Sequence, residues 1–203
     1  SVTCAVSCTV KTLYDQSGNG NDLLQATILA RPAYTISCVS SKPCMTFDGN
    51  NSQTLSATGF TQAQPLSVSF VAERTSNFTL QQIVFDSISG ANVQTGFRNS
   101  ANTAFAYAGL VLQATANDSA LHAVQSVFNG ASSEIVIDGS ATSGDVSTQG
   151  ISSTVFMGSS AGAGSFVFGF ISEVGVWPVA FTGTQSTNMC HNQFVYWGTS
   201  VSC

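Results

Sequence analysis

Residues 4–25 read Cys-Ala-Val-Ser-Cys-Thr-Val-Lys-Thr-Leu-Tyr-Asp-Gln-Ser-Gly-Asn-Gly-Asn-Asp-Leu-Leu-Gln. This stretch joins two close cysteines, a short β-prone run and a turn rich in glycine and amide side chains. Gly18 and Gly20 can adopt positive φ without steric cost. The oxygen atoms of Asp15 and Asn21 can bond to the nearby backbone or bind a hard cation. The stretch therefore predicts a strand that ends in a tight polar turn.

Short β-prone runs separated by turn residues recur along the rest of the chain. Alternation of polar and apolar side chains is clearest over residues 67–71 and 134–138, and three turn pairs separate such runs: Asp48-Gly49, Asn129-Gly130 and Asp138-Gly139. The runs expected to form strands are 10–14, 45–47, 66–73, 83–85, 104–108, 123–128, 134–137, 154–157 and 166–177. Their spacing predicts an all-β antiparallel β-sandwich. One short C-terminal helix is expected over about 185–196, capped by Thr182 or Thr184.

Length and charge narrow the classes of function. A chain of 203 residues with 43% hydrophobic residues can bury one sizeable core, so we expect a single domain over 1–203. The five basic residues are scattered singly and outnumbered by ten acidic ones, so no cluster of cations would neutralise a phosphate backbone. No apolar run approaches the roughly 20 residues of a membrane helix. Neither nucleic acid nor membrane insertion is expected.

The six cysteines fall into three pairs that are close in sequence: Cys4 with Cys8, Cys38 with Cys44, and Cys190 with Cys203. An even number of cysteines in a charge-poor chain is typical of disulfides formed in an oxidising compartment. The simplest of about 15 connectivities joins each local pair. We therefore expect a secreted, extracellular or cell-surface protein.

The N-terminal block resembles a known family. Cys4 to Cys8, followed by Tyr-Asp-Gln-Ser-Gly-Asn-Gly-Asn over 14–21, is similar to the catalytic domain of arabinofuranosidase B, an exo-acting glycosidase with a concanavalin A-like sandwich. The same signature resembles laminin-G-like jelly rolls, which share that sandwich and are mostly not catalytic. The laminin-G-like likeness extends over most of the chain, through Phe47-Asp48-Gly49, the hairpin at 122–139, Gly-Phe-Ile-Ser-Glu-Val at 169–174 and Trp197-Gly198. The resemblance implies a concanavalin A-like or laminin-G-like jelly roll over 1–203.

The catalytic residues of the arabinofuranosidase are missing at the matching positions. Its nucleophile, a glutamate, corresponds approximately to residues 106–109, which read Ala-Tyr-Ala-Gly. Its acid/base, an aspartate, falls at residues 157–160, which read Met-Gly-Ser-Ser. The adjacent cysteines of its sugar pocket fall at Ile83-Val84. The resemblance therefore carries the fold and not the activity.

Two carboxylate pairs remain as candidates. Glu73 ends one expected strand and Asp86 follows another, so the two could converge on one sheet face as a glycosidase pair about 5 Å apart. The alternative is that the two carboxylates are solvated at strand ends or paired with Arg74 and Arg98.

Asp15 and Glu173 form the second pair and would supply oxygen ligands to a structural Ca²⁺, as the laminin-G-like resemblance implies. The alternative is a turn in which Asp15 accepts backbone N–H bonds while Glu173 is buried against a polar partner.

Exposed aromatic rings are the usual platforms on which sugars stack. Tyr34, Phe97 and Tyr107 are candidates because they lie in or near expected loops. The sequence therefore predicts a secreted, non-catalytic carbohydrate-binding or cell-surface adhesion domain. An exo-acting arabinofuranosidase-type glycoside hydrolase is one alternative. A self-associating structural subunit of an extracellular filament or coat is the other.

Overall fold

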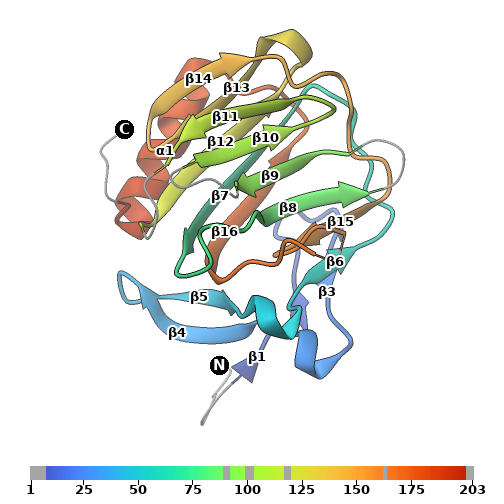
Figure 1. Ribbon diagram of the computed structural model, residues 1–203, viewed down its shortest axis with the longest axis vertical. Helices are drawn as coiled ribbons and strands as arrows, with labels where there is room; N and C mark the ends of the chain where they lie inside the picture. The colour runs from blue at the N-terminus through green and yellow to red at the C-terminus, as the bar shows by residue number, and fades with distance from the viewer. Residues whose placement is uncertain (1–7, 89–91, 99–102, 117–119, 162–163, 200–203) are drawn as a thin grey trace.

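Two stacked antiparallel sheets and one α-helix make up the fold (Figure 1). The computed structural model describes residues 8–88, 92–98, 103–116, 120–161 and 164–199. Sheet A contains, in spatial order, β1 (Cys8–Thr9), β4 (Ala33–Val39), β5 (Lys42–Phe47), β16 (Gly169–Trp177), β7 (Leu66–Arg74), β12 (His122–Phe128), β13 (Ser133–Ile137) and β14 (Ser140–Gly144). Sheet B contains β11 (Val111–Thr115), β10 (Thr103–Tyr107), β9 (Gln94–Phe97), β8 (Gln82–Ile88), β15 (Thr154–Met157), β6 (Leu55–Ala57), β3 (Leu23–Leu24) and β2 (Thr12–Leu13). Short 3₁₀ turns occur at Ile28–Ala30, Gly49–Asn51 and Gly130–Ser132. This arrangement is the all-β sandwich of jelly-roll type that the sequence predicts.

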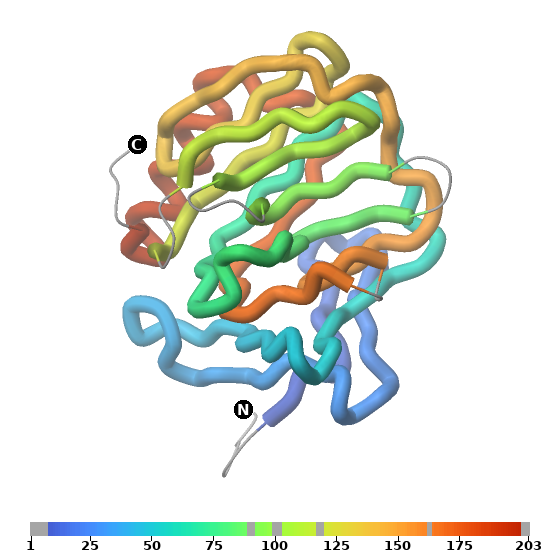
Figure 2. Tube along the Cα trace, viewed as in Figure 1, coloured from blue at the N-terminus to red at the C-terminus, as the bar shows by residue number. Residues whose placement is uncertain are grey.

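The core lies between the two sheets. Strand β7 shows why, because Leu66, Val68 and Phe70 belong to the core while Ser67 and Ser69 alternate with them and point the other way. Successive side chains of a strand point to opposite faces, so period-2 alternation fixes which face is buried. The outer face of sheet A is also covered, by helix α1 (Gly183–Trp197), which lies against it in Figure 2. Ser69 is therefore buried beneath the helix, and Ser67 beneath the segment that leads into it.

Helix α1 begins and ends on recognisable caps. The Thr182 hydroxyl accepts a hydrogen bond from the Gln185 backbone N–H, and the Gln185 side chain accepts one from the Thr182 N–H. This reciprocal arrangement satisfies two N–H groups at the helix start. Gly198 ends the helix in the left-handed conformation, with φ 71°. The helix predicted over 185–196 is confirmed, and Thr182 is its cap.

Several strands of the structure are not predicted by the sequence pattern. Strands β4, β6, β9, β11 and β14 were not among the expected runs. Strand β14 reads Ser-Ala-Thr-Ser-Gly and lies at the edge of sheet A with its side chains largely exposed. Strand β9 reads Gln-Thr-Gly-Phe and has no aliphatic β-branched residue. Pairing with neighbouring strands holds β9 and β14 extended, and their own propensity does not reveal it.

One expected disulfide lies wholly within the described residues. Cys38 and Cys44 form a bond that joins β4 to β5, with Cα atoms 5.7 Å apart. This pairing is confirmed. Cys8 and Cys190 are also disulfide-bonded, while their expected partners, Cys4 and Cys203, lie outside the described residues. No helix in the described part of the chain is long and apolar enough to cross a membrane.

Candidate functional site

A cleft lies where the 15–22 turn meets the two sheets, and we call it the Asp15 cleft. Its volume is about 520 Å³, within the size range of small-ligand sites. The polar lining residues come mostly from the turn: Asp15, Gln16, Ser17, Asn19 and Asn21, with Ser172 and Glu173 from β16. The other lining residues are Leu13, Tyr14, Leu23, Met45, Phe60, Phe85, Val155, Met157, Val174, Gly175, Val176 and Trp177. A polar rim thus surrounds an apolar floor.

The turn is held by the Asp15 carboxylate. Its Oδ1 accepts a hydrogen bond from the Ser17 N–H at 2.8 Å, and its Oδ2 accepts one from the Asn21 N–H at 3.0 Å. The Asp15 N–H in turn donates to Asp22 Oδ1 at 2.8 Å. Hydrogen bonds from the side chain and backbone of Ser17 lower the pKa of Asp15 to about 2, with a contribution from Asn21. A rigid, ionised carboxylate therefore sits at the rim of the cleft.

Aromatic side chains contribute to both the rim and the walls. Tyr14, next to Asp15, is 66% exposed although it lines the cleft. Trp177 also lines it and packs against Phe181, with ring centroids 5.0 Å apart. Gly175 makes room for this indole, since a Cβ at that position would clash with the Trp177 ring. Amide groups and partly exposed rings on an apolar floor are the usual composition of a site for an amphipathic ligand.

A bulge in β16 directs the Glu173 carboxylate toward helix α1. The pairing with β7 shifts between Ile171 and Glu173, so Ser172 is the extra residue. Such a bulge resets the alternation of faces. Ile171 and Val174 consequently both reach the core, while the Glu173 carboxylate faces the helix. The bulge explains why simple alternation along Phe-Ile-Ser-Glu-Val does not locate this carboxylate.

The Glu173 carboxylate is engaged by two donors from α1. Its Oε1 accepts from Gln193 Nε2 at 3.0 Å, and its Oε2 accepts from Trp197 Nε1 at 2.7 Å. Gln193 Nε2 also donates to Ser69 Oγ at 2.9 Å. These bonds tie the buried face of the helix to sheet A.

Asp15 and Glu173 line the same cleft, but their carboxylates bind different partners. The Asp15 oxygens accept backbone N–H bonds and the Glu173 oxygens accept side-chain N–H bonds from the helix. This matches the alternative that the sequence left open for the pair. Among the residues that the structure describes, no three His, Cys, Asp or Glu side chains gather as ligands for a metal ion. A Ca²⁺ held by Asp15 and Glu173 therefore stays a prediction without a ligand cluster to support it.

Glu73 and Asp86 do not converge on one sheet face. Glu73 lies in β7 of sheet A, and Asp86 lies in β8 of sheet B. Burial raises the pKa of Glu73, an effect that nearby His122 opposes, and burial also raises the pKa of Asp86. Asp86 is fully buried and its Oδ2 accepts from the Ala161 N–H at 2.7 Å. The expectation of one shared face is wrong, because the loop after β7 carries the chain to the opposite sheet.

The three aromatic residues proposed as sugar platforms, Tyr34, Phe97 and Tyr107, lie in three different strands. Phe97 is 2% exposed and packs edge-on against Phe70 in the core, with centroids 6.1 Å apart, so its ring does not face solvent. Its position in β9 puts its ring on the same face as Thr95, which reaches Ser126 across the core. Tyr34 is 40% exposed in β4 of sheet A, and Tyr107 is partly exposed in β10 of sheet B. Neither lines the Asp15 cleft.

Sequence reasoning singled out the turn but did not identify it as one wall of a cleft. The residues that it missed are Tyr14, Gln16 and Trp177. One signal was present in the sequence, because a tyrosine directly precedes a run of amide and hydroxyl side chains. The apolar floor gave no such signal, since its members come from strands far apart in the chain.

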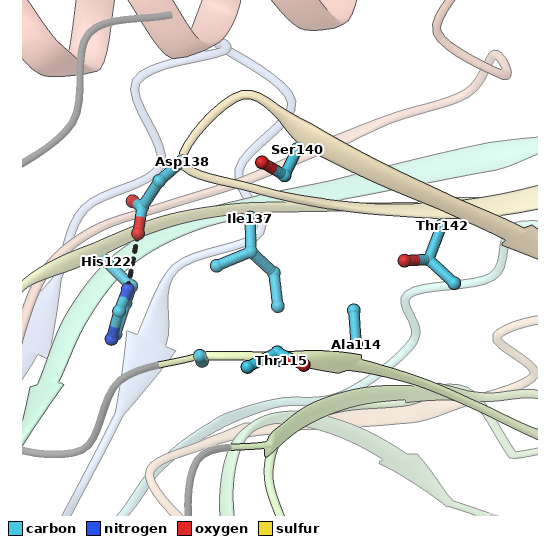
Figure 3. A pocket seen from close by; sticks show the side chains of 8 residues that line it. Ala114, Thr115, His122, Ile137, Asp138, Ser140 and Thr142 are labelled. Atoms are coloured by element: carbon cyan, nitrogen blue, oxygen red, sulfur yellow. Dashed lines mark hydrogen bonds and ion pairs between the residues drawn. The ribbon is translucent and has the colours of Figure 1, made fainter.

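A smaller cleft of about 390 Å³ opens between β11 and the β13–β14 hairpin. His122 and Asp138 lie in its wall, and His122 Nδ1 is 2.6 Å from Asp138 Oδ2 (Figure 3). Asp138 Oδ1 accepts from the Ala123 N–H at 2.9 Å. Ser140 also lines this cleft, but Figure 3 shows the imidazole directed at Asp138 and not at the Ser140 hydroxyl. The pair fastens the 138–139 turn to the start of β12.

Comparison with known proteins shows the fold alone. No family model matches the chain, and no curated protein matches it. A similar solved structure is domain 4 of AbnA, a GH43 extracellular arabinanase from Geobacillus stearothermophilus, in complex with arabinotriose; it is 13% identical with a TM-score of 0.58, over 78% of this chain and 81% of that one. The binding domain of Paraclostridial Mosquitocidal Protein 1 is 10% identical with a TM-score of 0.67, over 95% of this chain and 54% of that one. The receptor binding domain of botulinum neurotoxin D is 12% identical with a TM-score of 0.67, over 96% and 55%. The chain spans about half the length of these two toxin domains, and what it shares with all three is a β-sandwich.

Proposed function

We propose that this chain is a non-catalytic carbohydrate-binding domain and that the Asp15 cleft is its binding site. The observation that carries the proposal is the composition of the cleft. Amide and hydroxyl groups of Gln16, Ser17 and Asn19 stand at the rim, and Tyr14 exposes 66% of its surface beside them. A sugar ring has apolar C–H faces and a polar periphery, so it matches an aromatic ring flanked by amides.

The kinds of protein that share the fold support a binding role. One similar structure is a domain of an arabinanase solved with arabinotriose, and the others are toxin binding domains. An extracellular location belongs to the same proposal, since the disulfide between β4 and β5 suits an oxidising compartment. A glycan exposed outside the cell is the partner that fits both the binding role and the extracellular location.

The glycosidase alternative has less support. Retaining glycosidases hold two carboxyl groups about 5 Å apart, and inverting ones separate them by roughly 6.5–9.5 Å. Glu73 and Asp86 belong to opposite sheets, and the Glu173 carboxylate is occupied by helix donors. The Asp15 pKa of about 2 suits a permanently ionised group and not a general acid near neutral pH.

The test combines a glycan array with an activity assay on an aryl arabinofuranoside. We expect binding to a subset of glycans and no turnover. Replacing Tyr14 with alanine should weaken binding roughly two- to tenfold, the usual contribution of one stacking ring. Asn19→Ala should weaken it as well, because Asn19 is an exposed amide of the rim.

Tyr196→Ala is the matched control, since Tyr196 is 52% exposed on α1 and does not line the cleft. This variant should bind like the wild type. Turnover of the arabinofuranoside would favour the glycosidase instead. Glycan binding that is unchanged in both Tyr14→Ala and Asn19→Ala would show that the Asp15 cleft is not the binding site. If no glycan on the array binds, the proposed function is wrong.

A further inference from the structure

The charges around the Asp15 cleft are all of one sign. The chain contains five lysine and arginine residues, and none of them lines the cleft: Lys11, Arg31, Lys42, Arg74 and Arg98. The lining residues that carry a charge are Asp15 and Glu173, and the Glu173 carboxylate faces helix α1, so the charge presented to a ligand is that of Asp15. A ligand bound there meets negative charge without a compensating cation from a lysine or arginine.

Most of the cations are committed elsewhere by their own contacts. Arg31 donates from Nε to the Gln25 carbonyl at 2.8 Å. The Lys42 ammonium lies 4.7 Å from the centroid of the Tyr196 ring. Arg74 is 2% exposed and donates to the Arg98 carbonyl at 2.9 Å, so it cannot swing out to the surface. Arg31, Lys42 and Arg74 are therefore held by contacts with residues outside the cleft lining.

The Asp15 carboxylate is held in place by its turn and carries a constant negative charge. Backbone N–H groups of Ser17 and Asn21 occupy one acceptor position on each oxygen. Side-chain hydrogen bonds from Ser17 and Asn21 also reach this carboxylate, so what it presents to a ligand is chiefly its negative charge. The low pKa of about 2 keeps the group ionised over the whole neutral and mildly acidic range. Its charge thus stays constant where binding is measured.

We infer that the Asp15 cleft selects its glycan by charge: it prefers sugar units that carry a free amino group to neutral units, and it rejects units that carry a carboxylate. This inference rests on the proposed function, and it adds the class of ligand. A protonated amine brings three N–H donors and a positive charge to the Asp15 oxygens. A carboxylate on the sugar would face Asp15 with no cation to offset the repulsion. The amino sugar is therefore the unit that complements both the amide rim and the charge.

The test uses four β-1,4-linked hexasaccharides with the same backbone, built from glucosamine, N-acetylglucosamine, glucose and glucuronic acid. Calorimetric binding is measured at pH 6, where the free amine is protonated. The glucosamine hexamer should bind roughly two- to fivefold more tightly than the glucose hexamer, the range of an exposed ion pair. That preference should shrink in 0.5 M NaCl because salt screens exposed charges. The glucuronic acid hexamer should bind most weakly.

Variants distinguish the effect of the Asp15 charge from the effect of the structure of its turn. Asp15→Asn should abolish the preference for glucosamine over glucose. Asp48→Asn is the matched control, because Asp48 accepts a similar N–H bond, from Asn50 at 3.0 Å, in a turn outside the cleft lining. Asn19→Lys places a cation on an exposed rim position and should raise affinity for the glucuronic acid hexamer. This gain does not depend on the stability of the Asp15→Asn turn.

The outcomes distinguish the two proposals. Glucuronic acid binding at least as tightly as glucosamine, or no binding of the glucosamine hexamer by a protein that binds neutral glycans on an array, would overturn the charge inference alone. An array on which neutral, amino and acidic glycans all fail to bind would overturn the proposed function itself. A glucosamine preference that Asp15→Asn removes and Asp48→Asn keeps would establish the inference.

Discussion

Removing the Glu173 carboxylate should destabilise the protein strongly, because two buried donors depend on it. Trp197 is 6% exposed and its Nε1–H donates to Glu173 Oε2 at 2.7 Å. Gln193 is fully buried and donates to Oε1 at 3.0 Å, although its Nε2 keeps a second acceptor in Ser69 Oγ. The perturbation is Glu173→Ala, with Glu173→Gln as its isosteric companion.

The magnitude follows from what each donor loses. A buried donor left without an acceptor costs about 1–3 kcal/mol. Trp197 loses the acceptor that the structure gives its N–H, so about 2 kcal/mol is assigned to it. Gln193 keeps one bond, so about 1 kcal/mol is assigned to it. Glu173→Ala should therefore lower the free energy of unfolding by about 3 kcal/mol, and Glu173→Gln by about 1–2 kcal/mol, because its amide retains one acceptor oxygen.

The measurement is urea unfolding followed by circular dichroism, which reports the whole sandwich and not only the environment of Trp197. The slope of the free energy with urea should stay unchanged while the midpoint falls. A loss of about 3 kcal/mol corresponds to a fall in melting temperature of roughly 6–12 °C for a chain of this size. Glu134→Ala is the matched control, a partly exposed carboxylate in β13 of the same sheet, and should change stability by no more than about 0.5 kcal/mol. A Glu173→Ala protein within about 0.5 kcal/mol of the wild type would refute the reasoning.

Three further perturbations test other parts of the fold. Burial raises the pKa of Asp86, so the folded state favours its protonated form; Asp86→Asn should raise the free energy of unfolding relative to the wild type at pH 7, and urea titrations should show this advantage vanish below the unfolded pKa near 3.8. The Cys38–Cys44 disulfide closes a short loop, and serine at both positions should lower the free energy of unfolding by about 2 kcal/mol in differential scanning calorimetry, whereas an unchanged melting temperature would contradict the loop-closure argument. A Cβ at Gly169 would clash with a backbone carbonyl of β7, so Gly169→Ala should cost about 3 kcal/mol or prevent folding, while Gly183→Ala, with open space around it, should change stability by less than about 1 kcal/mol.

The strands with clear alternation could be predicted because their information is local. Alternation in polarity is clearest over residues 67–71 and 134–138, where β7 and β13 lie. Pro178 follows directly after β16, and because it has no backbone N–H it cannot continue the ladder of hydrogen bonds. The Asp138-Gly139 pair adopts positive φ at both positions, 49° and 83°, as a two-residue hairpin turn requires. Each of these signals depends on residues within a few positions of one another.

The candidate site was predictable only in its turn. Asp15, Gly18 and Gly20 mark that turn, with φ of 83° and 76° at the two glycines. The floor of the cleft combines Leu13, Phe85 and Val174, which are distant in sequence and meet only through packing. No local pattern records which distant side chains will share a cavity.

The sequence by itself determined the β-sandwich class, the polar turn at 15–22 and the capped helix, and it favoured the Cys38–Cys44 pairing, since propensity, turn chemistry and closeness in sequence act over a few residues. Only the tertiary structure placed Glu73 and Asp86 in opposite sheets, and only the bulge at Ser172 turned Glu173 toward the helix. Sheet membership and register depend on pairing between segments far apart in the chain. One inserted residue reverses the face of all the residues that follow it in the strand, so Glu173 could be assigned to a face of the sheet only after the strands were paired.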